Sequence, residues 1–162
     1  MAAKKDFDEQ SWKILRETPQ LVGTAMMMAG ASGLGTIKES FAIGQGLMEG
    51  QASATPLIRQ LNLREEILAA QASVKEWVQK GDAGDIKTRV RVEAIDKCRA
   101  AITVLQAHGS QEDLAAFRDW VYALAEGVAK AACEGGVLGF GGVRISPEEQ
   151  SLLDDLKAAM NP

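Results

Sequence analysis

The chain has 162 residues, of which 46% are hydrophobic and 25% charged, and this composition is ordinary for one soluble globular domain. We therefore predict a single domain over residues 1–162. The net charge of −4 gives no reason to expect a nucleic acid or an anionic membrane surface as a partner. Charged residues open the chain and no apolar run follows them, so we expect no secretory signal and predict a cytoplasmic protein.

The composition also favours helices. Only 5% of the residues are aromatic and four are proline, whereas residues with high helix propensity such as Ala, Leu, Glu and Lys are plentiful. We predict an all-α fold, an antiparallel bundle of about six to seven helices. Three of these helices should be long, and the others shorter and interrupted by glycine.

The first two predicted helices meet at a proline. Asp6 and Glu9 have the spacing of a capping box, which predicts a short helix that ends near Glu17. Thr18 and Pro19 then predict a new helix start, because a hydroxyl caps the helix and the missing proline N–H falls where no helical partner exists.

This second helix belongs to the most apolar stretch of the chain, residues 18–37, which carries no formal charge. A helix that is apolar on every side is buried in a core or lies in a membrane. Its strongly apolar part, residues 21–31, is shorter than the roughly 20 residues that a membrane-spanning helix needs. We therefore predict a central core helix, in which Gly23 and other small residues let a neighbouring helix approach closely.

Residues 36–48 predict a short helix that its glycines weaken. Thr55 and Pro56 repeat the start signal and begin a long helix that ends near Lys80, with an irregularity at Asn62.

Residues 85–107 predict the fifth helix, although residues 87–92 alternate as a strand would, because a lone strand would have no partner. Gly109 ends this helix and Ser110 caps the next one, whose apolar face consists of Leu114, Phe117, Val121, Leu124 and Val128. We expect the helices joined by the turns at residues 81–84 and at Gly109 to form an antiparallel three-helix core.

The strongest helix start in the chain is Ser146, Pro147 and Glu149, which combine an N-cap, a proline at the first helical position and a capping-box glutamate. It predicts a last helix with four inward-facing apolar residues, Leu152, Leu153, Leu156 and Met160.

The titratable residues argue against common enzyme sites. His108 is the only histidine, and residue 105 is leucine, so the Glu-x-x-His motif of di-iron bundles is absent. A catalytic triad would need His108 as its base, but this residue is predicted at a helix end, where an imidazolium interacts well with the helix dipole. We assign it a structural role and predict no catalytic residue, no metal and no cofactor, which leans against an enzyme.

Cys98 and Cys133 are predicted to lie some 20 Å apart along the helix axes, at about 1.5 Å of rise per residue. That separation is beyond disulfide reach, and a reducing compartment also disfavours a disulfide, so both should be buried thiols. Five basic residues at 87–99 alternate with acidic ones, which favours a solvated face over a nucleic-acid surface.

Glycine-rich stretches invite an anion-binding interpretation. Gly33 and Gly35 precede the helix of residues 36–48, and Lys38 lies in its first turn, where backbone N–H groups can bind an anion. Neither these residues nor residues 134–142 match a Walker loop. We therefore prefer a helix break here and keep the anion site as an alternative.

Several segments resemble a group of small helical bacterial proteins of unknown function. They are Trp12-Lys-x-Leu15, Pro19, Ser32-Gly33-x-Gly35-x-x-Lys38-Glu39, and residues 134–142 followed by Ser146-x-x-Glu149. The resemblance spans nearly the whole chain. It implies a bacterial cytosolic protein and no particular activity or ligand.

Our first functional hypothesis is a non-enzymatic protein that self-associates or binds a protein partner through an apolar face. The short, glycine-weakened helices need more burial than one subunit supplies, and the face would include Met26, Met27, Phe41 and Leu47.

The first alternative is a small-molecule or anion-binding protein, or an enzyme, with a pocket between the short N-terminal helices that uses Gly33, Gly35 and Lys38. The second alternative is peripheral association with a membrane through the uncharged residues 18–37.

Overall fold

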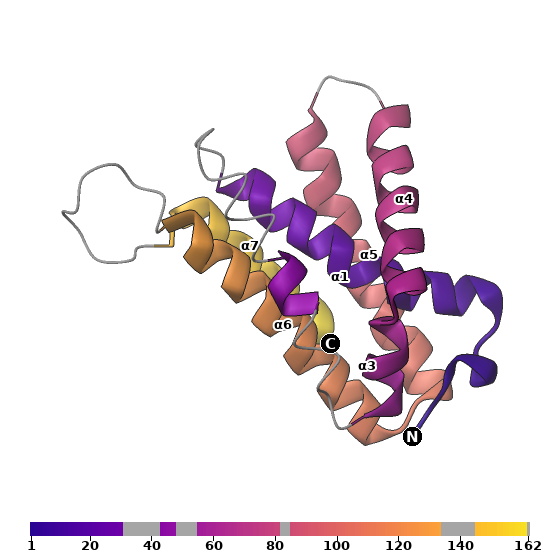
Figure 1. The fold of residues 1–162 in the computed structure, drawn as a ribbon. Helices are drawn as coiled ribbons and strands as arrows, with labels where there is room; N and C mark the ends of the chain where they lie inside the picture. The colour runs from indigo at the N-terminus through magenta and orange to yellow at the C-terminus, as the bar shows by residue number, and fades with distance from the viewer. Residues whose placement is uncertain (31–42, 48–54, 82–84, 134–144, 162) are drawn as a thin grey trace.

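The computed structural model describes residues 1–30, 43–47, 55–81, 85–133 and 145–161, and its all-α architecture is drawn in Figure 1. Within these ranges there are helices and no strand, so the predicted all-α bundle is confirmed. The elements are the 3-10 helix η1 (Lys4–Asp6), α1 (Glu9–Ala29), α3 (Pro56–Leu61), α4 (Arg64–Lys80), α5 (Ile86–His108), α6 (Gln111–Cys133) and α7 (Pro147–Met160). Residues 43–47 are also helical.

Helix α1 is the centre of the bundle, and it packs against α4, α5, α6 and α7 (Figure 1). Its second half is enclosed because Leu21, Val22, Ala25 and Met26 are all at most 3% exposed. The predicted central core helix is therefore present. None of the helices in the described ranges combines the length and the hydropathy that crossing a bilayer requires.

The predicted break between two helices at Thr18 is wrong, because α1 continues through Pro19 without interruption. Asp8 caps the helix instead of Asp6, and its side chain accepts a hydrogen bond from the Ser11 backbone N–H. A proline inside a helix removes one backbone hydrogen bond and crowds the preceding turn. At this point the Thr18 hydroxyl donates to the Ile14 carbonyl at 2.7 Å, and burial of the surrounding turns keeps the helix continuous.

The irregularity predicted at Asn62 is a complete break between α3 and α4. The Asn62 side chain is fully buried, and its Nδ2 donates to the Ile58 carbonyl at the end of α3 at 2.8 Å. Leu63 then takes an extended conformation and serves as the N-cap of α4. The one long helix predicted between residues 55 and 80 is therefore two helices.

The last three helices begin and end close to where the sequence predicts. Asp85 caps α5, and residues 87–92, which alternate like a strand, are helical. The predicted apolar stripe of α6 is buried throughout, from Leu114 at its start to Val128 near its end. At α7 the Ser146 hydroxyl and the Glu149 carboxylate form the predicted capping box.

The predicted three-helix core of α4, α5 and α6 is wrong in its arrangement. The α4 and α5 backbones each pack on α1 rather than closely on one another, and Figure 1 shows them as separate rods. Helix α1 offers the buried apolar side chains of Leu15, Leu21, Val22 and Met26, so the amphipathic helices bury their apolar faces against it.

Small residues bring residues 43–47 close to α1 and α6, as predicted for Gly23. A Cβ atom added at Gly23 would lie 2.9 Å from Cγ1 of Ile43, and one added at Gly46 would lie 3.1 Å from Cγ of Leu124. The Trp120 indole N–H also donates to the Gly46 carbonyl at 3.0 Å. Both helices therefore hold this short segment in place.

Candidate functional site

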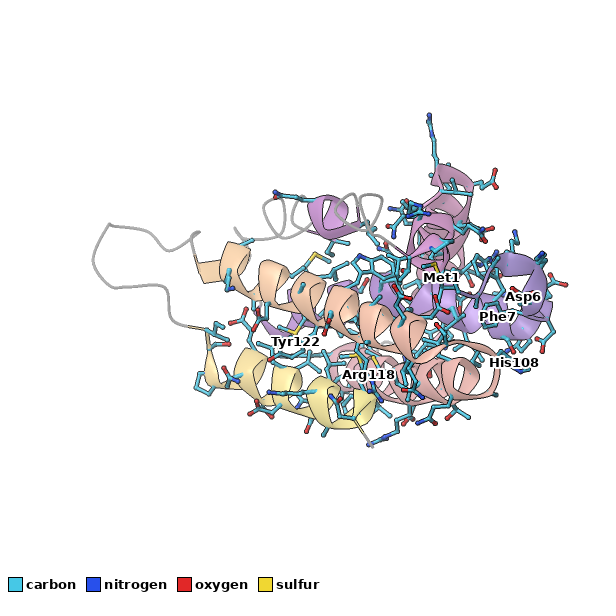
Figure 2. All side chains as sticks on the ribbon, turned by 90° about the horizontal axis from the view of Figure 1, so that it is seen from below. Met1, Asp6, Phe7, His108, Arg118 and Tyr122 are labelled. Atoms are coloured by element: carbon cyan, nitrogen blue, oxygen red, sulfur yellow. The ribbon has the colours of Figure 1, made fainter. Side chains whose placement is uncertain are left out.

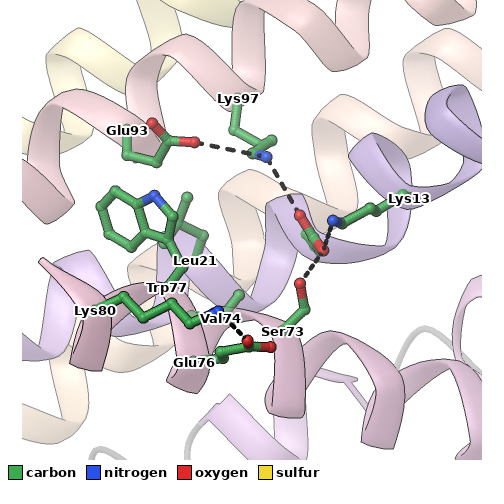
Figure 3. Close-up of a pocket in the computed structure, with 10 residues that line it drawn as sticks. Lys13, Leu21, Ser73, Val74, Glu76, Trp77, Lys80, Glu93 and Lys97 are labelled. Carbon is green, nitrogen blue, oxygen red and sulfur yellow. Dashed lines mark hydrogen bonds and ion pairs between the residues drawn. The ribbon is translucent and has the colours of Figure 1, made fainter.

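A cavity of about 300 Å³ lies between α1, α4 and α5, and Figure 3 shows the side chains that line it. Its position follows from the fold, because α4 and α5 each pack on α1 and make little backbone contact with one another. The lining combines charged and apolar side chains: Lys13, Glu17, Leu21, Ser73, Val74, Glu76, Trp77, Lys80, Glu93 and Lys97.

Helical spacing brings these residues to one place. Lys13, Glu17 and Leu21 are four residues apart along α1, so they share one face of that helix. Glu93 and Lys97 have the same spacing on α5, and the α4 residues of the lining lie between positions 73 and 80. Each helix therefore contributes one face to the cavity wall.

The Glu17 carboxylate is the most deeply buried charge of the cavity, with the residue only 4% exposed. Its Oε1 accepts a hydrogen bond from the Ser73 hydroxyl at 2.5 Å, and its Oε2 accepts one from Lys97 Nζ at 3.2 Å. Removing a carboxylate from water costs free energy unless such partners replace the water. These hydrogen bonds, one from α4 and one from α5, hold the carboxylate against the cavity (Figure 3).

The lysines around Glu17 are held with different strengths. Lys97 Nζ also lies 3.5 Å from Glu93 Oε1, so Lys97 bridges two carboxylates. Lys13 Nζ lies 3.9 Å from Glu17 Oε1, which is longer than a hydrogen bond, and its side chain is 44% exposed. Lys13 is therefore the more available of these two cations.

A fourth ion pair lies on α4, where Lys80 Nζ is 2.5 Å from Glu76 Oε1. The hydrogen bond from Lys80, together with its positive charge, holds the pKa of Glu76 below its ordinary value. Both side chains are exposed, so this pair contributes little to stability and remains free to exchange partners.

Trp77 provides the aromatic surface of the cavity, beside Leu21 and Val74. The guanidinium carbon of Arg89 lies 4.9 Å from the centre of its ring, and Arg89 Nη2 donates to the Val78 carbonyl at 2.9 Å. The hydrogen bond to the Val78 carbonyl holds the guanidinium in place, and the cation–π interaction with the guanidinium orients the indole.

Gly81 makes the position of this guanidinium feasible. A Cβ atom added at Gly81 would lie only 1.1 Å from Nη1 of Arg89. The backbone of Gly81 is in an ordinary extended conformation, so close approach rather than backbone freedom requires glycine at this position.

The residues predicted for the anion site, Gly33, Gly35 and Lys38, lie outside the described residues, as does Phe41 of the predicted interface. Met26 is fully buried and Leu47 is 5% exposed, so within one chain these two residues belong to the core and not to an exposed face. Met27 is half-buried and packs against the same core.

His108 lies at the end of α5, as predicted, and it is exposed. Its ring meets the Phe7 ring edge-on, with 6.1 Å between the ring centres, and Figure 2 labels both residues at the same end of the bundle. Cys98 is fully buried, and burial raises the pKa of its thiol to about 12, which opposes a nucleophilic role. Among the residues that the structure describes, no group of His, Cys, Asp or Glu side chains has the geometry of a metal site.

A second cavity, of about 310 Å³, lies between α1, α5 and α7. Lys87 Nζ lies 2.5 Å from Glu148 Oε2 at its edge, and both side chains are at least half exposed. Arg91 Nη2 lies 2.5 Å from Asp155 Oδ2, whose side chain is also half exposed. Unlike the first cavity, this one has no deeply buried charge among the described residues of its lining, so the first cavity is the candidate site.

The sequence did not point to this cavity, for two reasons. Glu17 was predicted as the end of a short helix, whereas it lies within the continuous α1 and is buried. The basic residues of α5 were expected on one solvated face, whereas Lys97 and Arg89 reach toward α1 and α4, and Arg91 reaches toward α7. The available signal was the run Lys13, Glu17, Leu21 at a spacing of four, which shares one helix face across the proline.

Comparison with protein-family models, with curated proteins and with solved structures finds no match to this chain. The resemblance to small helical bacterial proteins therefore stays a prediction. The geometry of the cavity between α1, α4 and α5 is the observation from which function is argued.

Proposed function

We propose that the chain is a small-molecule-binding protein whose ligand occupies the cavity between α1, α4 and α5. The observation that carries this proposal is the buried Glu17 carboxylate, held by Ser73 and Lys97 at the cavity wall. Ligand sites typically combine an apolar surface with a few fixed polar groups, and Trp77 and Leu21 supply the apolar part here.

A purely structural role explains this arrangement less well. Replacing a buried ion pair by packed apolar residues is often neutral or stabilising, so charges of this kind are weak devices for stability alone. In this cavity the charges line an open space of about 300 Å³, which has room for a small ligand.

The proposal is tested with the full chain and two matched variants. Glu17→Gln keeps the shape of the side chain and removes its negative charge from the cavity wall. Glu126→Gln removes one negative charge from an exposed ion pair on α6. We expect a metabolite from a broad panel to raise the melting temperature of the wild type and of Glu126→Gln, and to have a much smaller effect on Glu17→Gln.

Native mass spectrometry of the purified chain provides a second measurement, because a tightly held ligand adds a discrete mass. The proposal fails if no compound raises the melting temperature, or if the compounds that do so act equally on both variants. Equal effects would place binding elsewhere on the surface.

Self-association or binding of a protein partner through an apolar face stays a prediction, and so does association with a membrane surface. In the described ranges the exposed large apolar residues are few: Met1, Leu63, Leu68 and Val92. A mass measurement by light scattering tests self-association, and a monomer at micromolar concentration would contradict it. Full recovery in the supernatant after sedimentation with liposomes would contradict the membrane hypothesis.

A further inference from the structure

Among the residues that the structure describes, the six ionisable ones that line the cavity carry equal numbers of positive and negative charges. Lys13, Lys80 and Lys97 oppose Glu17, Glu76 and Glu93. A ligand with a net charge would upset this balance in a partly buried space, where an uncompensated charge is costly. A ligand that carries one charge of each sign preserves the balance.

The cavity offers donors for a ligand carboxylate next to Glu17. An ammonium group has three N–H donors, and Lys97 directs its ammonium toward Glu17 and Glu93, which leaves one donor. Lys13 is too far from Glu17 for a hydrogen bond and has its donors available. A ligand carboxylate between Lys13 and Lys97 would therefore form charge-assisted hydrogen bonds.

The same wall offers acceptors for a ligand ammonium. Glu93 is 34% exposed and is approached by Lys97 at 3.5 Å through one oxygen only, so its other oxygen can accept from a ligand. Glu17 is already occupied at both oxygens, by Ser73 and Lys97, and acts as the fixed group that positions Lys97.

The volume of the cavity and its apolar lining limit the part of the ligand that carries no charge. A volume of about 300 Å³ is at the lower end of ligand pockets, which favours a small ligand over a dinucleotide or a large cofactor. Trp77, Leu21 and Val74 form an apolar patch within the cavity, suited to an aliphatic or aromatic group.

From these observations we infer that the ligand is a small zwitterion of the amino-acid type, with its carboxylate at Lys13 and Lys97, its ammonium at Glu93 and its apolar group against Trp77. The inference rests on the proposed function and narrows it to one chemical class.

The experiment is isothermal titration calorimetry of the full chain with the free L-amino acids, followed by the N-acetyl and amide forms of each one that binds. The N-acetyl form lacks the positive charge, and the amide lacks the negative charge. We expect the free amino acid to bind at least about tenfold more tightly than either form, since the N-acetyl form loses the charge-assisted hydrogen bond to Glu93 and the amide loses those from Lys13 and Lys97.

Two variants assign the groups. Glu93→Gln should weaken the binding of the free amino acid and of the amide, because Glu93 accepts hydrogen bonds from the ligand ammonium. The binding of the N-acetyl form, which has no ammonium, should be unchanged. Glu126→Gln on α6 is the control and should bind all three forms as the wild type does.

The inference is overturned if the N-acetyl form or the amide binds as tightly as the free amino acid, or if no amino acid binds. Failure of the proposed function is distinguishable from this outcome. If another metabolite binds in a manner that depends on Glu17, the cavity is a ligand site and only the ligand class is wrong.

Discussion

The Glu66 side chain of α4 links the N-terminal residue Lys4 and the α1 residue Arg16 through ion pairs. Its carboxylate is 3% exposed, and it lies 2.5 Å from Lys4 Nζ and 3.2 Å from Arg16 Nη1. Lys4 Nζ is also 5.8 Å from the centre of the Trp12 ring. Burial raises the pKa of Glu66, but the hydrogen bonds from Lys4 and Arg16 outweigh it, so the pKa lies below its ordinary value.

A lowered pKa makes the stability that Glu66 contributes dependent on pH. This contribution is complete above the unfolded pKa of 4.5 and is lost as the pH falls from 4.5 through the lower folded pKa. We expect Glu66→Gln to lower the free energy of unfolding at pH 7 by about 1–3 kcal/mol, since it weakens hydrogen bonds to a charged group. The difference from the wild type should shrink as the pH approaches 3.

Urea unfolding at several pH values between 3 and 7 measures this difference. Glu65→Gln is the matched control, because Glu65 is the exposed neighbour and its substitution should change little at any pH. A loss for Glu66→Gln that is the same at pH 7 and pH 3 would show that its charge is not responsible.

Two glycines illustrate how whole elements contact one another. Gly23 in α1 faces Ile43, and an added Cβ would lie 2.9 Å from a side-chain atom of a stiff β-branched residue. Gly127 in α6 has no described atom, apart from the nearby backbone of its own helix, within 4 Å of the place where a Cβ would lie. The same substitution therefore meets a neighbouring segment in one helix and open space in the other.

We expect Gly23→Ala to lower the free energy of unfolding by about 1–3 kcal/mol, because the added methyl group overpacks the contact with residues 43–47. Gly127→Ala should raise the free energy of unfolding by about 0.5–1 kcal/mol, since alanine is the better helix former. Chemical denaturation of both variants measures whether each substitution lowers or raises the free energy of unfolding. If both substitutions stabilise the protein, residues 43–47 do not pack on α1 as described.

At the scale of the whole molecule, one apolar core extends from α1 to α7. Helix α7 packs on α5, α6 and α1, and Leu156 in its middle is fully buried. Because no described helix has a separate core of its own, a loss of packing in α7 should destabilise every helix together.

Leu156→Ala should lower the free energy of unfolding by about 2–5 kcal/mol, the usual loss when a buried leucine becomes a cavity. Far-ultraviolet circular dichroism and tryptophan fluorescence should report one shared transition with an unchanged denaturant slope. Leu68→Ala is the control, since Leu68 is 52% exposed and its truncation should cost under about 0.5 kcal/mol. Separate transitions for the two probes would contradict a single cooperative core.

Local signals predicted most of the helices but not the way in which they assemble. The stop at Gly109 and the caps at Ser110 and Ser146 act within one turn of backbone, so sequence alone located the end of α5 and the starts of α6 and α7. The apolar residues of α6 and α7 repeat at helical spacing, which predicted their buried faces.

The centre of the bundle and the candidate site depend on contacts between distant segments. Thr18 and Pro19 carry a local start signal that burial against four other helices overrides, and the continuous helix turns Glu17 toward Ser73 and Lys97. These partners are 56 and 80 residues away along the chain. Short-range preferences of the backbone determine where helices form. The packing of α4 and α5 around α1 determines which charges meet inside the protein, because burial energies depend on neighbours that no local pattern specifies.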